Sequence, residues 1–239
     1  MEKNQFSRTE LLIGNENLEK LKKSKVAIFG VGGVGSYVAE GLARSGIGHL
    51  VLIDWDKINV TNINRQIMAL HSTIGKSKTE IMKQRILDIN PNAIVETYLP
   101  SEIDGGEENL LDSTFSYVVD AIDTMSSKIK LIEKAHKLGL KIISATGAGN
   151  KLDPTKFEVS DIYKTSVCPV CKILRKELKS RGIKKHKVVF SKEEPIKPGS
   201  CIENGKQVLS SISFVPSVAG LIVSGEVIKE IIKWKVLFI

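Results

Sequence analysis

The chain has few cysteines, few aromatic residues and no long apolar run. Its 239 residues include 3 cysteines, and aromatic residues make up 5%. The small, odd number of cysteines argues against a disulfide framework. The polar, charged amino terminus argues against a secretory signal. The longest apolar candidates, residues 142–148 and 218–223, are far shorter than the roughly 20 residues needed to span a bilayer. We therefore expect a cytoplasmic protein without stable membrane association.

The remaining composition is that of an ordinary globular protein, with 42% hydrophobic and 26% charged residues. The net charge of +8 favours a polyanionic partner, although a lysine-rich composition also produces basic enzymes without one. We see no repeats and no low-complexity segment. The length suits a single domain over residues 1–239, with a nucleotide-binding core at 1–150 and a substrate-facing part with a closing helix at 151–239.

Residues 26–54 carry the strongest pattern in the chain. An apolar run at 26–29 is followed by a glycine-rich turn, by helical spacing over 37–43, and by a second apolar run at 49–53 that ends in Asp54. This order predicts a βαβ nucleotide-binding unit. The glycines let backbone N–H groups approach a phosphate, and Asp54 is placed to accept hydrogen bonds from a ribose hydroxyl. By itself the unit fits NAD, FAD, SAM or ATP; the turn glycines are Gly30, Gly32, Gly33 and Gly35.

The rest of the chain alternates between strand and helix patterns. We predict helices at 77–89 and 125–138 and strands at 94–99, 115–119 and 140–145. Beyond Lys151 we expect a strand and turn at 157–163, a basic helix at 169–181, a flexible loop at 194–207 and a closing helix from about Val218. Residues 6–14 form an amphipathic arm. The fold class is therefore α/β, a Rossmann-like, mostly parallel sheet flanked by helices, with a C-terminal basic helix and additional strands.

Polar residues follow several predicted strands and point to one shared site. The carboxyl ends of parallel strands lie at one edge of the sheet, so the glycine turn, Asp54, Asp120, Asp123 and residues 146–149 should converge there. The loop after Asp54 and the next helix add Asn62, Arg65 and Lys78.

Two cations and an acid suit the transfer of AMP to a carboxylate. Cations offset the charge that builds on the α-phosphate, and Asp123 can hold Mg²⁺, whereas hydride transfer has little use for such a set. The simpler alternatives are that Arg65 and Lys78 are solvated surface charges and that Asp123 caps the following helix.

These motifs resemble those of a known superfamily. GVGGVGS, DWDKINVTNINRQ, GKSKTE and DAID are similar to the ATP-binding signature of the ThiF/MoeB/HesA proteins, which include the ubiquitin-activating enzymes. The similarity covers nearly the whole chain. FSRTELLIG, DAIDTMSSKIKLI, TGAGNKLDPTKFEVSDIYKT and the basic helix after it resemble the branch of tRNA threonylcarbamoyladenosine dehydratases (TcdA, also called CsdL).

The resemblance implies homodimers that adenylate a carboxylate with ATP and Mg²⁺. In the tRNA branch this carboxylate belongs to N6-threonylcarbamoyladenosine, and attack by the neighbouring carbamoyl group closes a ring and releases AMP. The implied roles are phosphate binding by the four turn glycines, Asn62 and Arg65, ribose binding by Asp54, and stabilisation of the α-phosphate by Lys78. Asp123 matches the aspartate associated with Mg²⁺. Arg8 matches an arginine supplied by the partner subunit.

The three cysteines fall outside this pattern. Cys168 and Cys171 form a CxxC pair, but a structural zinc site normally has four ligands, and only Cys201 and the weak candidate His186 remain. We therefore expect no zinc; packing or a redox dithiol are the other interpretations of the pair. Cys201 is either an ordinary loop cysteine or a sulfur carrier working with a cysteine-desulfurase or sulfur-acceptor system. A monovalent cation near the site is left open by the sequence.

The basic helix is the candidate tRNA-binding surface, because phosphate contacts need exposed cations. The alternative is a solvated helix face. The residues are Lys172, Arg175, Lys176, Lys179, Lys184 and Lys185, with Arg181 and Lys187 beside them. Two other functions stay open: adenylation of the C-terminal glycine of a ubiquitin-like sulfur carrier, and a nucleotide-binding scaffold without turnover.

Overall fold

The structure, a computed structural model, describes residues 3–99, 105–196, 202–203, 206–207 and 209–234. A seven-stranded sheet runs through the molecule in the order β3-β2-β1-β4-β5-β7-β6. All neighbouring strands pair in parallel except β6 and β7, which are antiparallel. The prediction of a mostly parallel α/β sheet is confirmed. The strands are β1 (Lys25–Phe29), β2 (His49–Ile53), β3 (Ile94–Tyr98), β4 (Tyr117–Asp120), β5 (Ile142–Ala145), β6 (Phe157–Asp161) and β7 (Lys187–Ser191).

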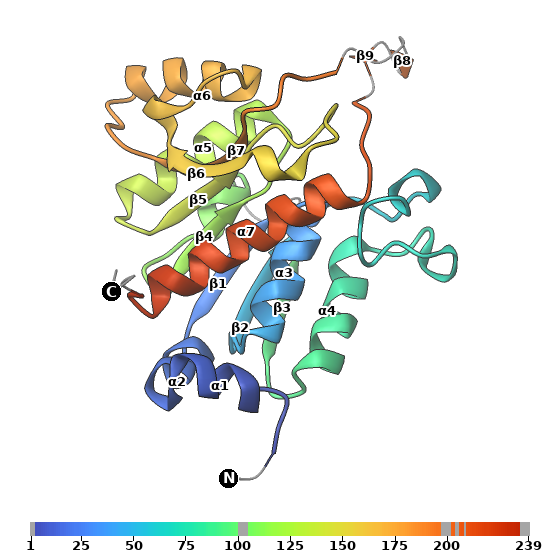
Figure 1. Cartoon of the computed structure of the whole chain (residues 1–239), viewed down its shortest axis with the longest axis vertical. Helices are drawn as coiled ribbons and strands as arrows, with labels where there is room; N and C mark the ends of the chain where they lie inside the picture. Colours follow the sequence, from blue (N-terminus) through green and yellow to red (C-terminus); the bar gives the residue numbers. More distant parts are fainter. Residues whose placement is uncertain (1–2, 100–104, 197–201, 204–205, 208, 235–239) are drawn as a thin grey trace.

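Helices cover both faces of this sheet (Figure 1). On one face lie α3 (Gly35–Arg44), α4 (Lys78–Ile89) and α7 (Phe214–Ile231), and on the other α5 (Met125–Lys137) and α6 (Pro169–Ser180). Because successive strand residues point to opposite faces, Val26 and Ile28 pack under the first set of helices and Ala27 and Phe29 under the second. Burial on both sides explains why the strands read as continuous apolar runs.

Two parts of the sequence-based prediction are wrong. β7 was not predicted, because its apolar residues follow the charged stretch 184–187, yet it lies between β5 and β6 in the sheet. The closing helix α7 begins at Phe214, four residues before the predicted start. Pro216 is tolerated there because the first turn of a helix needs no N–H donor at that position. A side chain at Gly220 would place a Cβ 2.4 Å from the Val34 carbonyl oxygen, so glycine lets α7 pack closely on α3.

The predicted loop at 194–207 also contains regular structure in its described part. Two short strands, β8 (Ile202–Glu203) and β9 (Lys206–Gln207), pair antiparallel. Cys201 lies outside the described residues. Among those described, every helix is too short or too polar to span a bilayer.

Two short helices lie at the end of the sheet where β1 begins (Figure 1), and the first of them forms the predicted arm at residues 6–14. These are α1 (Ser7–Ile13) and α2 (Asn15–Lys22). Phe6 is buried, whereas Leu11 and Leu12 are 81% and 76% exposed. The arm therefore presents two large apolar side chains to solvent within this chain.

Candidate active site

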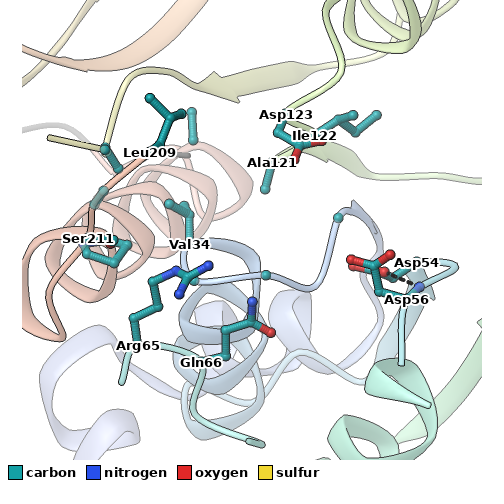
Figure 2. Close-up of a pocket in the computed structure, with 18 of the residues that line it drawn as sticks. Val34, Asp54, Asp56, Arg65, Gln66, Ala121, Ile122, Asp123, Leu209 and Ser211 are labelled. Carbon is teal, nitrogen blue, oxygen red and sulfur yellow. Dashed lines mark hydrogen bonds between the residues drawn. The ribbon is translucent and has the colours of Figure 1, made fainter. Parts of the chain in front are cut away.

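A cavity of about 590 Å³ lies at the carboxyl edge of the central strands. Its walls come from the glycine turn after β1, the segment after β2, the start of α4, the segment after β4 and the loop Thr146–Gly149 after β5. Figure 2 shows Arg65 and Gln66 on one side of the cavity and Asp123 across from them. The sequence-predicted convergence of these segments is thus observed.

The glycine turn is shaped by two positions that exclude a side chain. Gly30 has φ +86°, and a Cβ there would lie 2.6 Å from the Ala121 carbonyl oxygen. A Cβ at Gly35 would lie 1.8 Å from the Gly30 carbonyl oxygen. Gly30, Gly32 and Gly33 line the cavity, but Gly35 does not. Gly35 therefore closes the turn rather than facing a ligand.

Asp54 ties the end of β2 to the glycine turn. The backbone N–H groups of Val31 and Asp56 donate to its carboxylate at 2.7 and 2.8 Å. Burial raises the pKa of Asp54, and attraction to Lys78 opposes this rise. The carboxylate is thus fixed at the rim of the cavity, where one oxygen can also accept from a ligand hydroxyl.

Lys78 is the first residue of α4 and points back toward the segment after β2. Its ammonium group lies 2.6 Å from the Asp56 carboxylate, and its side chain is only 5% exposed. The Ser77 side chain caps the helix by accepting from the Glu80 N–H. Lys78 lines the cavity, so burial and the ion pair hold a cation at its wall.

Arg65 is a second cation at the cavity, and it donates its side-chain hydrogen bonds to neutral acceptors. The guanidinium donates to the Thr61 carbonyl and the Asn64 side-chain oxygen, both at 2.9 Å. Partial burial lowers its pKa, with no carboxylate contributing. Asn62 also lines the cavity, and its side-chain oxygen accepts from the Asn59 N–H at 3.0 Å. Arg65 thus carries a half-buried charge without a carboxylate partner in the described part of the chain.

Asp123 faces this cation as an exposed carboxylate, and its one described hydrogen bond comes from the Thr124 hydroxyl at 3.3 Å. The described residues contain no group of three side chains that could hold a metal by themselves. Mg²⁺ commonly takes one or two carboxylates together with substrate phosphates and water. A single aspartate at the mouth of a nucleotide cavity fits that mode of binding.

Two further polar groups at the cavity were not predicted from the sequence. The Lys128 ammonium is buried and donates to the Asp120 carboxylate at 2.8 Å and to the Ala145 carbonyl at 3.1 Å. It joins β4 to β5 beneath the cavity. Gln66 is also buried, and its Oε1 atom has no hydrogen-bond partner. The amide nitrogen of Gln66 points toward the cavity beside Gly32 (Figure 2), where it can donate a hydrogen bond to a ligand.

The remaining predicted site residues lie away from the cavity. Arg8 is exposed on α1, at the end of the sheet opposite the cavity (Figure 1). On and after α6, Lys172, Lys176, Lys179, Lys184 and Lys185 are exposed. Arg175 differs, because it donates to the carbonyl and hydroxyl of Thr165. Val170, in the first turn of α6, lines the cavity, so this basic helix begins at the cavity wall.

The cysteine pair is buried at the same place. Cys168 precedes α6 and Cys171 lies in its first turn, with its sulfur 3.2 Å from the Thr146 hydroxyl. His186 is turned to other partners: its ring lies within hydrogen-bonding distance of the Ser144 hydroxyl, at 2.8 Å, and of the His136 ring, at 3.4 Å.

Comparison with known proteins identifies the family of the chain. The ThiF family matches residues 6–237. A protein of Bacillus subtilis named tRNA threonylcarbamoyladenosine dehydratase is 46% identical over 241 residues, covering 96% of this chain and 95% of its own. The protein of the same name from Escherichia coli K12 is 37% identical over 203 residues, covering 82% and 76%.

Solved structures give the same result. The E. coli enzyme, TcdA, in complex with AMP has a TM-score of 0.86 to this structure at 34% identity, covering 96% of this chain and 94% of its own. Its complex with ATP has a TM-score of 0.85 at 33% identity, with the same coverage. The chain therefore belongs to the ThiF family and, within it, to the tRNA threonylcarbamoyladenosine dehydratases.

Proposed function

We propose that this protein uses ATP to dehydrate N6-threonylcarbamoyladenosine in tRNA to a cyclic derivative, releasing AMP and pyrophosphate. One observation carries the proposal. Arg65 is a half-buried cation without a carboxylate partner among the described residues, and it lies at the wall of a cavity formed by the glycine turn. Its relatives in solved structures bind AMP and ATP. Unpaired positive charge in a partly desolvated cavity favours a phosphate ligand.

The residues of the cavity suit an adenylation step. We assign the phosphates to Gly30, Gly32, Gly33 and Asn62 and the ribose to Asp54, with Arg65 and Lys78 at the α-phosphate. As the substrate carboxylate attacks the α-phosphorus, negative charge grows on the phosphate oxygens, and the two cations stabilise it. Pyrophosphate leaves and an acyl-adenylate remains. The carbamoyl group of the same side chain then attacks the acyl carbon, and AMP leaves.

No protein nucleophile is needed for the second step. The carbamoyl group and the activated carboxyl group belong to one side chain, so their effective concentration is high. Asp123 lines the cavity and would hold Mg²⁺, which would supply further neutralisation of the phosphate charge when bound. Asp123, Arg65 and Lys78 are the catalytic residues within this chain.

Arg8 completes the proposal from a second subunit. In its own chain α1 lies at the far end of the sheet from the cavity (Figure 1). The exposed Leu11 and Leu12 beside it give the arm an apolar surface that a second copy can cover. We therefore propose a homodimer in which Arg8 enters the site of the partner subunit.

The basic surface of α6 is the proposed contact with the tRNA backbone. Lys172, Lys176 and Lys179 repeat at helical spacing on an exposed face, and the helix starts at Val170 in the cavity wall. Phosphates bound along this face would bring the modified nucleoside to the cavity from the 151–239 side, while the 1–150 core holds the nucleotide. We expect the enzyme to act in the cytoplasm, where tRNA and ATP meet.

The proposal is tested by incubating the purified protein with ATP, Mg²⁺ and tRNA that carries threonylcarbamoyladenosine. We expect AMP to appear in equal amount with a nucleoside that has lost the mass of one water. AMP formation that depends on a ubiquitin-like sulfur carrier instead of tRNA would transfer the assignment to that substrate. ATP binding without turnover on either substrate would contradict an enzymatic function. Asp123→Asn, whose side chain keeps its size, is the matched inactive control.

A further inference from the structure

Two buried thiols that the proposed reaction does not use lie behind the wall of the ATP cavity. Cys168 is the residue before the first turn of α6, and Cys171 lies in that turn. Their exposed fractions are 2% and 0%. Val170, between them, lines the cavity, and so does Thr146, whose hydroxyl contacts the Cys171 sulfur. The pair therefore touches the nucleotide site from behind.

The pKa values of the two thiols are shifted in opposite directions. A hydrogen bond from the Cys171 thiol and the N–H groups of the first helical turn lower the pKa of Cys168 to about 6, against the effect of burial. The same hydrogen bond, together with burial, raises the pKa of Cys171. The buried ammonium of Lys151 also attracts the Cys168 sulfur. A thiolate at the helix start with a protonated thiol behind it is the arrangement of an attacking and a resolving cysteine.

The segment that covers Cys168 is strained and faces solvent. Val167 has φ +63°, a conformation that β-branched residues rarely adopt. The Cys168 N–H donates to the Ser166 carbonyl at 2.6 Å, which closes a tight three-residue turn around Val167. Ser166 and Val167 are exposed, so opening of this turn gives solvent a route to the Cys168 sulfur.

The cavity loop is built directly against this sulfur. Gly147 has φ +58°, and a Cβ there would lie 2.8 Å from the Cys168 sulfur. Gly147 is part of the loop Thr146–Gly149 that lines the cavity. With no free space between sulfur and loop, a displacement of Cys168 has to move the loop as well.

We propose that Cys168 and Cys171 form a reversible disulfide with small-molecule disulfides as the oxidant, and that the oxidised form binds ATP more weakly. This inference rests on the ATP site of the proposed function. Cys168 attacks one sulfur of the small disulfide, forming a mixed disulfide and releasing one thiolate. Cys171 loses its proton and displaces the second thiolate from Cys168. The two cysteines lose two electrons and two protons in all, and the small disulfide is reduced to two thiols.

The test uses the full chain carrying Cys201→Ser, which removes the third thiol. The protein is treated with oxidised glutathione, quenched in acid, alkylated and analysed by mass spectrometry. We expect the peptide with both cysteines to lose two hydrogen atoms and to resist alkylation until dithiothreitol is added. The dissociation constant for ATP, from calorimetry, should rise by at least about fivefold on oxidation and recover on reduction.

Single substitutions assign the order of the steps. Cys171→Ser should stop at a glutathione adduct on Cys168, because no resolving thiol remains. Cys168→Ser should give no adduct and an ATP affinity that oxidised glutathione does not change. Absence of the internal disulfide, or unchanged ATP affinity in the fully oxidised protein, would overturn the inference. Neither readout uses tRNA, so a reduced protein that binds ATP but leaves tRNA unmodified would count against the proposed function alone.

Discussion

The ammonium group of Lys78 is held 2.6 Å from the Asp56 carboxylate at the wall of the nucleotide cavity. Lys78 is buried, whereas the Asp56 side chain is 53% exposed. An incoming phosphate can therefore replace Asp56 as the partner of the Lys78 ammonium, while the Asp56 side chain turns to solvent. The ion pair holds the Lys78 side chain at the cavity wall before the nucleotide arrives.

Replacing Lys78 should remove the charge that stabilises the α-phosphate during adenylation. We expect Lys78→Met, which keeps the length of the side chain, to lower kcat by roughly 10²–10³-fold. Lys76→Met is the matched control, because Lys76 is exposed two residues earlier. Steady-state AMP release measures both. Similar rates for the two variants would place Lys78 outside the reaction.

Gln66 should contribute to ATP binding through its side-chain amide nitrogen. Gln66→Leu keeps the approximate volume but removes an Oε1 atom that is buried without a partner, so the unliganded protein should not lose stability. Gln66→Leu also removes the Nε2 amide, which lies beside Gly32 and can donate to a charged phosphate, and loss of that hydrogen bond should raise the dissociation constant for ATP by about 10–100-fold.

Calorimetry with ATP and thermal unfolding without it measure the two effects separately. Gln84→Leu, at an exposed position of α4, is the control for adding a leucine. An ATP affinity for Gln66→Leu equal to that of the unmodified protein would remove Gln66 from the binding site.

His186 should make the protein sensitive to mild acid. Burial, followed by the charges of His136 and Lys128, lowers its pKa from 6.5 to about 3. In the unfolded chain His186 therefore binds a proton below pH 6.5, whereas in the folded chain it stays neutral down to about pH 3. The free energy of unfolding is therefore unaffected by this group above pH 6.5. It falls as the pH drops below 6.5, by roughly 2 kcal/mol at pH 5.

Urea unfolding at pH 7.5 and pH 5 measures this loss. His186→Gln should show a smaller difference between the two pH values, whatever its stability at pH 7.5. His71→Gln, at an exposed position, should keep the full difference. Equal pH dependence in all three proteins would show that His186 does not control acid stability.

Arg8 should act on the cavity of the other subunit. Arg8→Ala and Lys78→Ala proteins should each be nearly inactive. A mixed dimer restores one of its two sites, because that site combines the unchanged Lys78 of the first chain with the unchanged Arg8 of the second. Purified heterodimers carrying two different tags should release AMP well above either parent. Heterodimers as inactive as the parents would place Arg8 in the site of its own chain.

Local patterns made much of this fold predictable. The first βαβ unit is right because its glycines and apolar runs act within a few residues: β2 was predicted at its observed bounds, and β1 differs by one residue. The helix at 77–89 is confirmed with Ser77 as its cap. The sequence does not predict β7, because this short stretch becomes a strand through its pairing with β5 and β6 rather than through its own pattern.

The site was only partly predictable, for a similar reason. Arg65, Lys78 and Asp123 follow predicted strands or begin a predicted helix, so their convergence could be inferred from topology. Lys128 and Gln66 could not be found this way. Lys128 meets Asp120 only because α5 packs back onto β4, and the unpaired oxygen of Gln66 exists only once the surrounding loop has buried it.

The central claim is that the cavity transfers AMP to the carboxylate of a tRNA side chain. The direct measurement uses tRNA whose threonylcarbamoyladenosine carries ¹⁸O in the carboxylate. Attack of that carboxylate on the α-phosphorus predicts AMP with one ¹⁸O atom, formed in step with the cyclic nucleoside. Unlabelled AMP, or ADP in its place, would contradict the account.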